Sequence, residues 1–201
     1  KLAEETIAEF GRIDVLINNA GISMRALFNE TDLEVMHRVM DVNYWGTVNC
    51  TRYAMPHLLK TKGSLVGVIS VGGYIGLPAR TGYSASKFAV RGFLETVRVE
   101  NLKTGLHVLI AAPGFTASEI RKSALTGNGN QQGDTPRNES KMMSAEECAT
   151  HIFNVVKNRK RQLVLTFLEG KFTVFLSKFM PRFLEKMSYK MFANEPDSPL
   201  K

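Results

Sequence analysis

The sequence predicts an α/β fold in which a doubly wound parallel sheet lies between two layers of helices. Stretches with apolar residues at helical spacing alternate along the chain with short runs rich in Val, Ile and Leu. Those runs are continuously apolar, as expected for strands whose two faces are both covered. The 201 residues suffice for one domain with its own core, so residues 1–201 are expected to form a single domain.

The elements of the first half of the chain are predicted from the spacing of apolar residues and from the residues that begin or end helices and strands. A helix is predicted over residues 2–10 and ends at Gly11, and an apolar strand follows over residues 13–17. Thr31 or Asp32 is expected to cap a long helix that runs to about residue 59, with Glu34 as the partner in a capping box. Further along, the pattern predicts a strand over 64–70, a helix over 82–102 and a strand over 106–112.

The last third of the chain begins with a polar stretch. Residues 126–138 are rich in Gly, Asn and Gln and predict a mobile loop. Ser144 begins a helix to about residue 156, and a fourth strand is expected over 162–167. The remainder is helical and unusually aromatic, and Pro181 is expected to divide it into two helices.

Composition excludes several classes of protein. The chain is 44% hydrophobic and 22% charged, and it has neither an apolar run long enough to span a bilayer nor a signal-peptide pattern at its start. Of the net charge of +7, residues 151–201 carry ten Lys/Arg against four Asp/Glu, so the rest is nearly neutral, unlike a nucleic-acid enzyme. Cys50 and Cys148 lack metal-ligand spacing, which indicates no metal site and reduced thiols in a cytoplasmic protein.

Tyr83 and Lys87 are candidate catalytic residues. They lie four residues apart on a predicted helix, so their side chains share one face. A tyrosine has an ordinary pKa of about 10, and a nearby ammonium group lowers that value. A tyrosine tuned in this way gives a proton to a ketone oxygen or takes one from an alcohol. Ser70 ends the preceding strand, where active sites of open parallel sheets form, although a serine there often only closes a turn.

The spacing of these residues resembles the active-site signature of the short-chain dehydrogenase/reductase family. Ser70 precedes Tyr83 and Lys87 within VISVGGYIGLP (68–78) and YSASK (83–87). Three further motifs follow the family's order, namely NNAG at 18–21, the helix asparagine Asn43 and the PGFT turn at 113–116. Together the motifs cover residues 11–120. The resemblance implies a Rossmann-like sheet.

The resemblance also implies roles for these residues. Tyr83 would be the acid–base residue, Ser70 would position the substrate carbonyl, and Lys87 would lower the pKa of Tyr83 and bind the nicotinamide ribose. Asn43 would hold a water that links Lys87 to solvent. Asn18, Ala20 and Gly21 would run along the adenosine side of the cofactor, Pro113, Gly114 and Thr116 would border the nicotinamide, and Tyr83 and Lys87 would also contact the cofactor. The cofactor would be NAD or NADP, and the residue that selects between them is not readable here.

Compared with the family, the sequence starts in the helix before the fourth strand. The first three strands, with their helices and the glycine-rich phosphate turn, are absent from this sequence, a gap of roughly 65–75 residues. The strand at 13–17 would then expose an open apolar edge. We therefore expect these residues alone to fold poorly and to bind dinucleotide weakly.

Two segments concern substrate and partners. Residues 115–143 are expected to form the substrate lid, for which a plain disordered loop is an equal alternative. The C-terminal tail, residues 170–201, interleaves aromatic residues and Met with Lys and Arg. It could cap the cleft over a bulky apolar substrate, pack in a homodimer or homotetramer, or lie on an anionic membrane as a basic amphipathic helix.

The leading functional hypothesis is an NAD(P)-dependent oxidoreductase that interconverts a secondary alcohol and a ketone, with a small-molecule substrate and no nucleic-acid partner. A non-catalytic binding or scaffold protein of the same family is the first alternative, and the intact set of Asn43, Ser70, Tyr83 and Lys87 argues against it. A peripheral membrane module built on the tail is the second.

Overall fold

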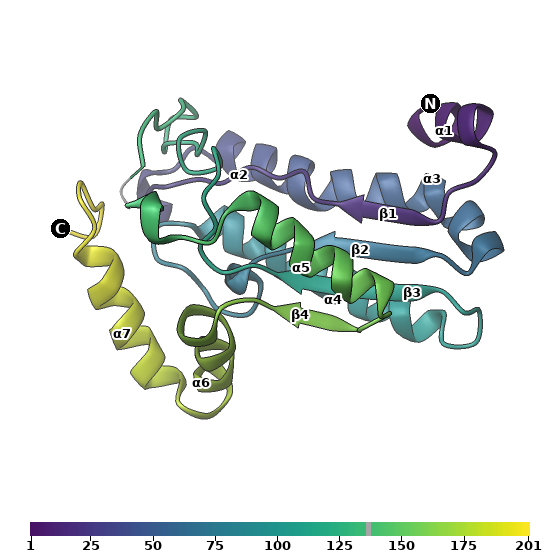
Figure 1. Cartoon of the computed structure of the whole chain (residues 1–201). Coiled ribbons are helices and arrows are strands. Elements are labelled where there is room, and N and C mark those ends of the chain that lie inside the picture. Colours follow the sequence, from purple (N-terminus) through teal and green to yellow (C-terminus); the bar gives the residue numbers. More distant parts are fainter. Residues whose placement is uncertain (136–137) are drawn as a thin grey trace.

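The computed structural model describes residues 1–135 and 138–201, and it has the expected α/β architecture (Figure 1). Within the described residues, four parallel strands form one sheet in the order β1-β2-β3-β4. The strands are β1 (Val15–Asn18), β2 (Ser64–Val68), β3 (His107–Ala112) and β4 (Gln162–Val164). Because all four run in one direction, their carboxyl ends meet at one edge of the sheet, where ligands bind in such folds.

Helices cover both faces of this sheet, as a parallel sheet requires (Figure 1). Helices α3 (Gly46–Thr61) and α4 (Thr81–Glu100) pack on one face, and α5 (Ala145–Lys157) packs on the other. Helix α1 (Leu2–Phe10) lies beyond the amino ends of the strands, α2 (Leu33–Met40) leads into α3, and α6 (Thr173–Phe179) and α7 (Pro181–Ala193) form a separate pair near the carboxyl edge.

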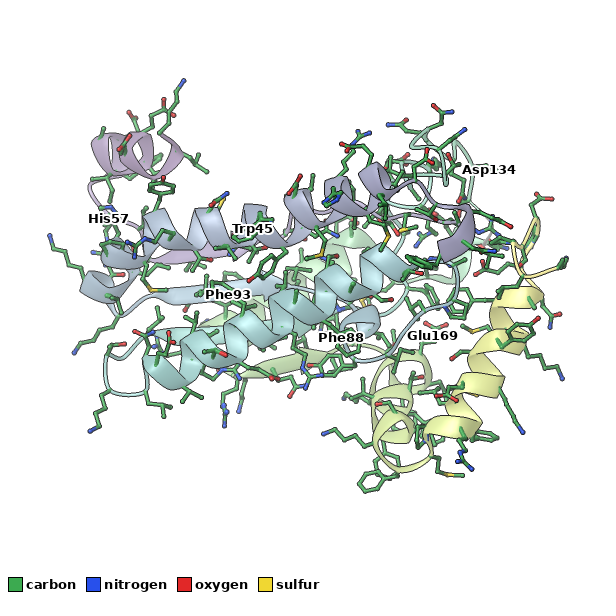
Figure 2. All side chains as sticks on the ribbon, turned by 180° about the vertical axis from the view of Figure 1, so that it is seen from behind. Trp45, His57, Phe88, Phe93, Asp134 and Glu169 are labelled. Atoms are coloured by element: carbon green, nitrogen blue, oxygen red, sulfur yellow. The ribbon has the colours of Figure 1, made fainter. Side chains whose placement is uncertain are left out.

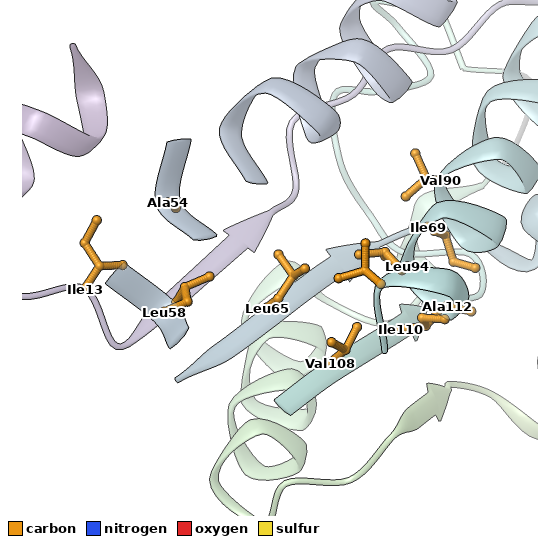
Figure 3. Close-up of a cluster of buried hydrophobic side chains, with 11 residues drawn as sticks. Ile13, Ala54, Leu58, Leu65, Ile69, Val90, Leu94, Val108, Ile110 and Ala112 are labelled. Atoms are coloured by element: carbon orange, nitrogen blue, oxygen red, sulfur yellow. The ribbon is translucent and has the colours of Figure 1, made fainter. Parts of the chain in front are cut away.

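The core between the sheet and the α3–α4 layer is formed by large aliphatic side chains (Figure 3). Leu65 on β2 and Leu94 on α4 are fully buried, and Gly67 makes room for them. A methyl group at Gly67 would lie 2.2 Å from Cδ1 of Leu94, so only glycine lets α4 approach the strand this closely. Close packing of α4 on β2 fixes the helix that carries Tyr83 and Lys87.

The long helix predicted from residue 31 to 59 is not uniform. Helix α2 begins after Asp32, whose side chain makes no cap hydrogen bond, and Thr31 donates instead to the carbonyl of Leu27, so the predicted capping box with Glu34 is wrong. A π-helical turn, Asp41–Trp45, joins α2 to α3. Single π turns of this kind occur frequently at functional sites, and this one contains Asn43.

Two strands are shorter than predicted. Strand β2 ends at Val68, before Ser70, and β4 ends at Val164 rather than at residue 167. The chain leaves β4 through Thr166, whose φ is 62° and ψ 148°, and then forms the π-helical segment η5 (Phe167–Phe172). Leu165, Thr166 and Phe167 are residue types that favour strands and suggested a longer one, but the backbone turns there toward the α6–α7 pair.

Pro181 divides the tail into two helices, as predicted, and stands at the first turn of α7, where its missing N–H is not needed. Strand β1 is an edge strand with Val15 and Ile17 about half exposed, as the sequence indicated. In the predicted loop, Gly129 and Gly133 adopt positive φ, and Thr126 N–H donates to Asn130 O. Pro136 and Arg137 of that loop and of the predicted lid lie outside the described residues.

Candidate active site

The carboxyl ends of the strands open into one large cleft of about 1220 Å³. Ser70 follows β2, the Pro113-Gly114 turn follows β3, and the loop of residues 19–23 follows β1. Tyr83 and Lys87 enter the cleft from the first two turns of α4. Residues from four separate parts of the sequence therefore meet in one place, as the motif spacing predicted.

Tyr83 and Lys87 are both buried, with 9% and 4% of their surface exposed. The Lys87 ammonium donates to the Val68 carbonyl at 2.9 Å and lies 5.8 Å from the centre of the Tyr83 ring. This bond holds the ammonium at the end of β2, beside the phenol. Burial lowers the pKa of Lys87 to about 8, because the charged form loses hydration.

The pKa of Tyr83 is raised above its ordinary value. Burial is the main cause, and it outweighs a hydrogen bond with Ser70 and the positive charges of Arg80 and Arg121, which act in the opposite direction. The sequence-based expectation was a lowered pKa. The phenol in this environment is protonated at neutral pH, which suits it to donate a proton.

Ser70 has an extended backbone, and its hydroxyl accepts a hydrogen bond from the N–H of Gly72 at 3.2 Å. The serine thus closes a short 3₁₀ turn, Val71–Gly73, and also faces Tyr83. The turn role of Ser70 is observed, and it leaves room for the chemical role predicted from the sequence, because the hydroxyl accepts from the backbone and remains able to donate its own proton.

Asn43 is almost fully buried in the π-helical turn. Its side-chain oxygen accepts from Ile22 N–H at 2.8 Å, and its amide donates to Ile22 O and to Ser86 Oγ at 3.0 and 2.9 Å. Asn43 therefore ties the loop after β1 to α4. The water-holding role of Asn43 that the family resemblance implies stays a prediction. In this structure the side-chain amide of Asn43 bonds protein groups.

Gly21 lies between Asn43 and Lys87. A methyl group at this position would be 3.1 Å from Asn43 Oδ1 and 3.3 Å from Lys87 Nζ. The missing side chain keeps the floor of the cleft open next to the ammonium group. The surface around Gly21 has room for part of a dinucleotide, and the contact of Ala20 and Gly21 with the adenosine side of the cofactor stays a prediction.

The other predicted cofactor residues divide into two groups. Ala20, Gly21, Pro113, Gly114 and Thr116 line the cleft. Asn18 does not line it, and its side-chain amide donates to Thr51 Oγ1 at 3.1 Å, toward α3. Side chains alternate between the faces of a strand, so a position at the end of β1 does not by itself say which face its side chain takes.

The lining residues that sequence reasoning missed include Asn19, Arg80 and Arg121. Arg80 stands three residues before Tyr83 at the start of α4, a spacing that could have indicated it. Arg121 is held by the carbonyl of Thr116, five residues earlier, and by Glu139 at 2.7 Å, which is 18 residues away in the sequence. No local sequence pattern indicates the contact between Arg121 and Glu139.

A smaller apolar compartment of about 100 Å³ continues from Ser70 away from β1. One wall is formed by residues near the site, Val71, Ile75, Leu77 and Phe115. The opposite wall is α7, which contributes Leu184, Met187, Ser188 and Met191. Glu169 of η5 lies at this compartment and is exposed; Figure 2 labels it beside the α6–α7 pair.

Comparison with known proteins agrees with this geometry. Residues 1–129 match the short chain dehydrogenase family. Dehydrogenase/reductase SDR family member 7B of Mus musculus is 34% identical over 180 residues, which are 89% of this chain and 56% of the relative. An 11-beta-hydroxysteroid dehydrogenase A of Arachis hypogaea is 43% identical over 123 residues, which are 61% of this chain and 35% of that protein.

Solved structures share the fold. A short-chain dehydrogenase from Streptomyces avermitilis superposes with a TM-score of 0.76 at 23% identity, over 96% of this chain and 74% of that one. A short chain dehydrogenase from Burkholderia cenocepacia, in complex with NADP, gives 0.76 at 21% identity, over 92% and 73%.

The chain spans little more than half the length of the mouse relative, so the comparison concerns one part of such a protein. Within that part, the matched region includes the loop after β1, Asn43, Ser70, Tyr83, Lys87 and the Pro113-Gly114 turn. The chain belongs to the short-chain dehydrogenase/reductase family.

Proposed function

We propose that this chain forms the active-site part of an NAD(P)-dependent oxidoreductase that interconverts a secondary alcohol and a ketone. The observation that carries the proposal is the convergence of Ser70, Tyr83 and Lys87 in one cleft at the carboxyl edge of the sheet. Family membership supports the class of chemistry. A non-catalytic scaffold protein would have no need to keep a buried ammonium group and a buried phenol together, at a cost in stability.

The nicotinamide, when bound, supplies or accepts the hydride. In the direction of reduction, the Tyr83 phenol donates its proton to the carbonyl oxygen as the carbon–hydrogen bond forms, so the ketone becomes an alcohol. Ser70 donates a hydrogen bond to the same oxygen and holds it within reach of the phenol. In the direction of oxidation, the phenolate of Tyr83 takes the hydroxyl proton from the alcohol.

Lys87 stands between the phenol and the loop at Gly21, where its ammonium would bond the ribose of NAD or NADP and stabilise a phenolate on Tyr83. Asn43 keeps this arrangement by fixing Ile22 and Ser86 on either side. Pro113, Gly114 and Thr116 would border the nicotinamide on the far side of the cleft. The substrate would enter beside Ser70 and extend an apolar body toward α7.

Tyr83→Phe tests this assignment, because it removes one hydroxyl and keeps the ring. We expect kcat to fall roughly 10²- to 10⁴-fold, the usual contribution of a general acid. Fluorescence titration with NADPH and NADH should give an unchanged Kd, which separates lost chemistry from lost binding. Turnover within a factor of about two of the parent protein would exclude Tyr83 as the acid–base residue.

We also propose a homodimer or homotetramer that associates through the outer face of α3 and α4. Trp45 at the end of the π-helical turn before α3, Tyr53 of α3 and Phe88 of α4 are 42–71% exposed, and Figure 2 labels Trp45 and Phe88. Contiguous exposed aromatic residues commonly mark an interface between proteins. A Tyr53→Asp, Phe88→Asp double variant should sediment as a monomer, and an unchanged sedimentation coefficient would exclude this face.

The tail supports a separate proposal, peripheral contact with an anionic membrane by an otherwise cytoplasmic protein. Within the described residues, no helix is both long enough and apolar enough to cross a bilayer. Phe175, Phe179 and Phe183 are each more than half exposed, and Lys171, Lys178, Arg182, Lys186 and Lys190 lie among them. A surface of aromatic and basic residues favours an anionic lipid interface over a second copy with the same charge.

Vesicle co-sedimentation tests this contact. The parent protein should pellet with vesicles that contain phosphatidylserine and remain in solution with purely zwitterionic ones. A Phe175→Ser, Phe179→Ser variant should lose the binding, whereas Phe10→Ser, which removes an equally exposed phenylalanine from α1, should keep it. Equal binding by all three proteins would exclude the tail as the contact.

A further inference from the structure

A buried charge cluster connects the end of the tail to the active-site region. Glu195 is 6% exposed, and its Oε2 lies 3.5 Å from Nη2 of Arg25 and 3.8 Å from Nη2 of Arg80. Arg25 comes from the loop after β1, and Arg80 precedes α4. A buried carboxylate is costly unless it is paired, so this contact defines where the end of the tail lies.

Two more contacts fix the same position. Arg25 Nη2 donates to the carbonyl of Pro196 at 2.7 Å. The guanidinium of Arg80 lies 4.9 Å from the ring centre of Phe192, the last large apolar residue of α7, which is 2% exposed. The cluster therefore holds both the carboxyl end of α7 and the segment that follows it, as far as Pro196.

At its other end, the tail is joined to the sheet through Thr166. This residue has a φ of 62°, which is rare for a β-branched side chain and costs free energy. Its hydroxyl is buried and, in the described part of the chain, has no hydrogen-bond partner. A strained junction of this kind does not by itself fix the position of α6 and α7.

Between these two ends lies the wall of the apolar compartment. Leu184, Met187 and Met191 of α7 face Val71, Ile75 and Leu77 across a space that begins at Ser70. The position of α7 sets the width of that space. Within the described residues, the Glu195 cluster is a buried ionic contact that holds the C-terminal end of the tail, whereas Thr166 lies at the N-terminal end of the tail.

We propose that Glu195 is a positioning residue that fastens the tail to Arg25 and Arg80, so that α7 forms a fixed wall for substrates whose apolar body extends beyond the reacting carbonyl. This inference rests on the proposed function for the part that concerns substrate. The small end of the substrate contacts Ser70 and Tyr83 and does not depend on the wall. Loss of the fastening therefore affects large substrates selectively.

The test uses two matched ketones, cyclohexanone and 4-phenylcyclohexanone, which differ by one apolar ring. In the full protein, Glu195→Gln should raise KM for the phenyl ketone roughly tenfold and leave kcat/KM for cyclohexanone within about twofold, because only the larger ketone reaches α7. Glu185→Gln is the control, since it removes an exposed carboxylate from α7, the helix that precedes Glu195.

Amide hydrogen exchange provides a readout that needs no turnover. Residues 181–201 should exchange roughly tenfold faster in Glu195→Gln than in the control, while residues 107–112 of β3 stay protected, which shows that the fold is intact. Arg25→Gln should reproduce the effect from the other side of the cluster. The double variant should add little to either single change, because both remove the same contact.

Equal losses for the two ketones, or unchanged exchange at 181–201, would overturn the proposal. The exchange result is independent of the reaction. If Tyr83→Phe retained full turnover while Glu195→Gln still accelerated amide exchange at residues 181–201, the proposed role of Tyr83 would be excluded. The proposed role of Glu195 in holding the tail would be retained.

Discussion

The sheet with its helices and the C-terminal tail are held together in different ways. Around β2 and α4, aliphatic side chains such as Leu65 and Leu94 are fully buried, and Tyr83 and Lys87, two of the proposed catalytic residues, stand on α4. In α6 and α7, Phe175, Phe179 and Phe183 remain more than half exposed. The first region is fixed by apolar packing, whereas the position of the second depends on a few specific contacts.

This difference indicates which parts of the protein tolerate change. A catalytic constellation must be held within a fraction of an ångström, and close packing of α4 against β2 achieves this. A substrate wall has a looser requirement, and it can be replaced or moved without disturbing Ser70 or Tyr83. The following variants test how far this separation extends.

The largest effect is expected for Leu94→Ala in the core. Leu94 is fully buried, and it fills the space above Gly67 on β2. Truncation should lower the free energy of unfolding by about 2–5 kcal/mol, as buried leucines usually do, since it leaves a cavity under α4. Urea denaturation followed by circular dichroism measures this value. A loss below about 1 kcal/mol would mean that α4 is not held by packing on β2.

Lys87→Met should raise the stability of the protein while lowering its activity. Below pH 8 the folded protein carries a buried ammonium whose pKa is about 8, whereas in the unfolded chain the group keeps its ordinary value near 10.5. At pH 7 this difference disfavours folding by about 3 kcal/mol, and methionine removes the cost while filling a similar space. We expect a more stable protein with little or no turnover.

The sign of the pH dependence checks the cause. Between pH 8 and 10.5 the unfolded chain binds a proton that the folded protein has lost, so the parent protein should gain stability from Lys87 as pH rises through this window. The gain should be missing in Lys87→Met. Thermal unfolding of both proteins at pH 7 and pH 10 provides the comparison, and parallel behaviour would show that burial does not depress the pKa of Lys87.

The strands of the core and the meeting of Ser70, Tyr83 and Lys87 in one cleft were largely predictable from the sequence, whereas the proposed chemistry stays a prediction. Continuous apolar runs indicated the four strands, and the spacing of Ser70, Tyr83 and Lys87 places one residue at a strand end and two on one helix face. These are local relations, and local periodicity determines them. The cofactor contact predicted for Asn18 stays a prediction, and in the structure its side chain, at the last residue of β1, turns toward Thr51.

The tail and its fastening were not predictable in this way. Pro181 indicated the break between α6 and α7, but the pairing of Glu195 with Arg25 and Arg80 joins three distant segments and has no signature in any window of the sequence. The end of β4 at Val164, earlier than the sequence predicted, also depends on the tertiary structure rather than on the local sequence. Residues 165–167 are compatible with a strand, and only the tertiary course of the tail turns the backbone at Thr166.

A smaller effect is expected where the two regions join. Thr166→Gly should relieve the strain of a positive φ, which costs about 1–3 kcal/mol, against an entropy cost of about 0.5–1 kcal/mol for glycine. The net result should be stabilisation by about 1 kcal/mol, seen as a higher urea midpoint. Destabilisation would mean that packing of the threonine side chain against Gly114 outweighs its backbone strain.

The smallest effect on stability is expected for Phe179→Ser in the tail. Phe179 is 68% exposed, and its ring contacts Phe175 at 4.7 Å between centres. Removing an exposed ring should change the free energy of unfolding by no more than about 0.5 kcal/mol. The same change should weaken binding to phosphatidylserine vesicles, because the ring contributes apolar area to the lipid interface. A large loss of stability would instead show that Phe179 packs against protein in solution. In that case α6 would belong to the packed part of the molecule, and only α7 would differ from the core in how it is held.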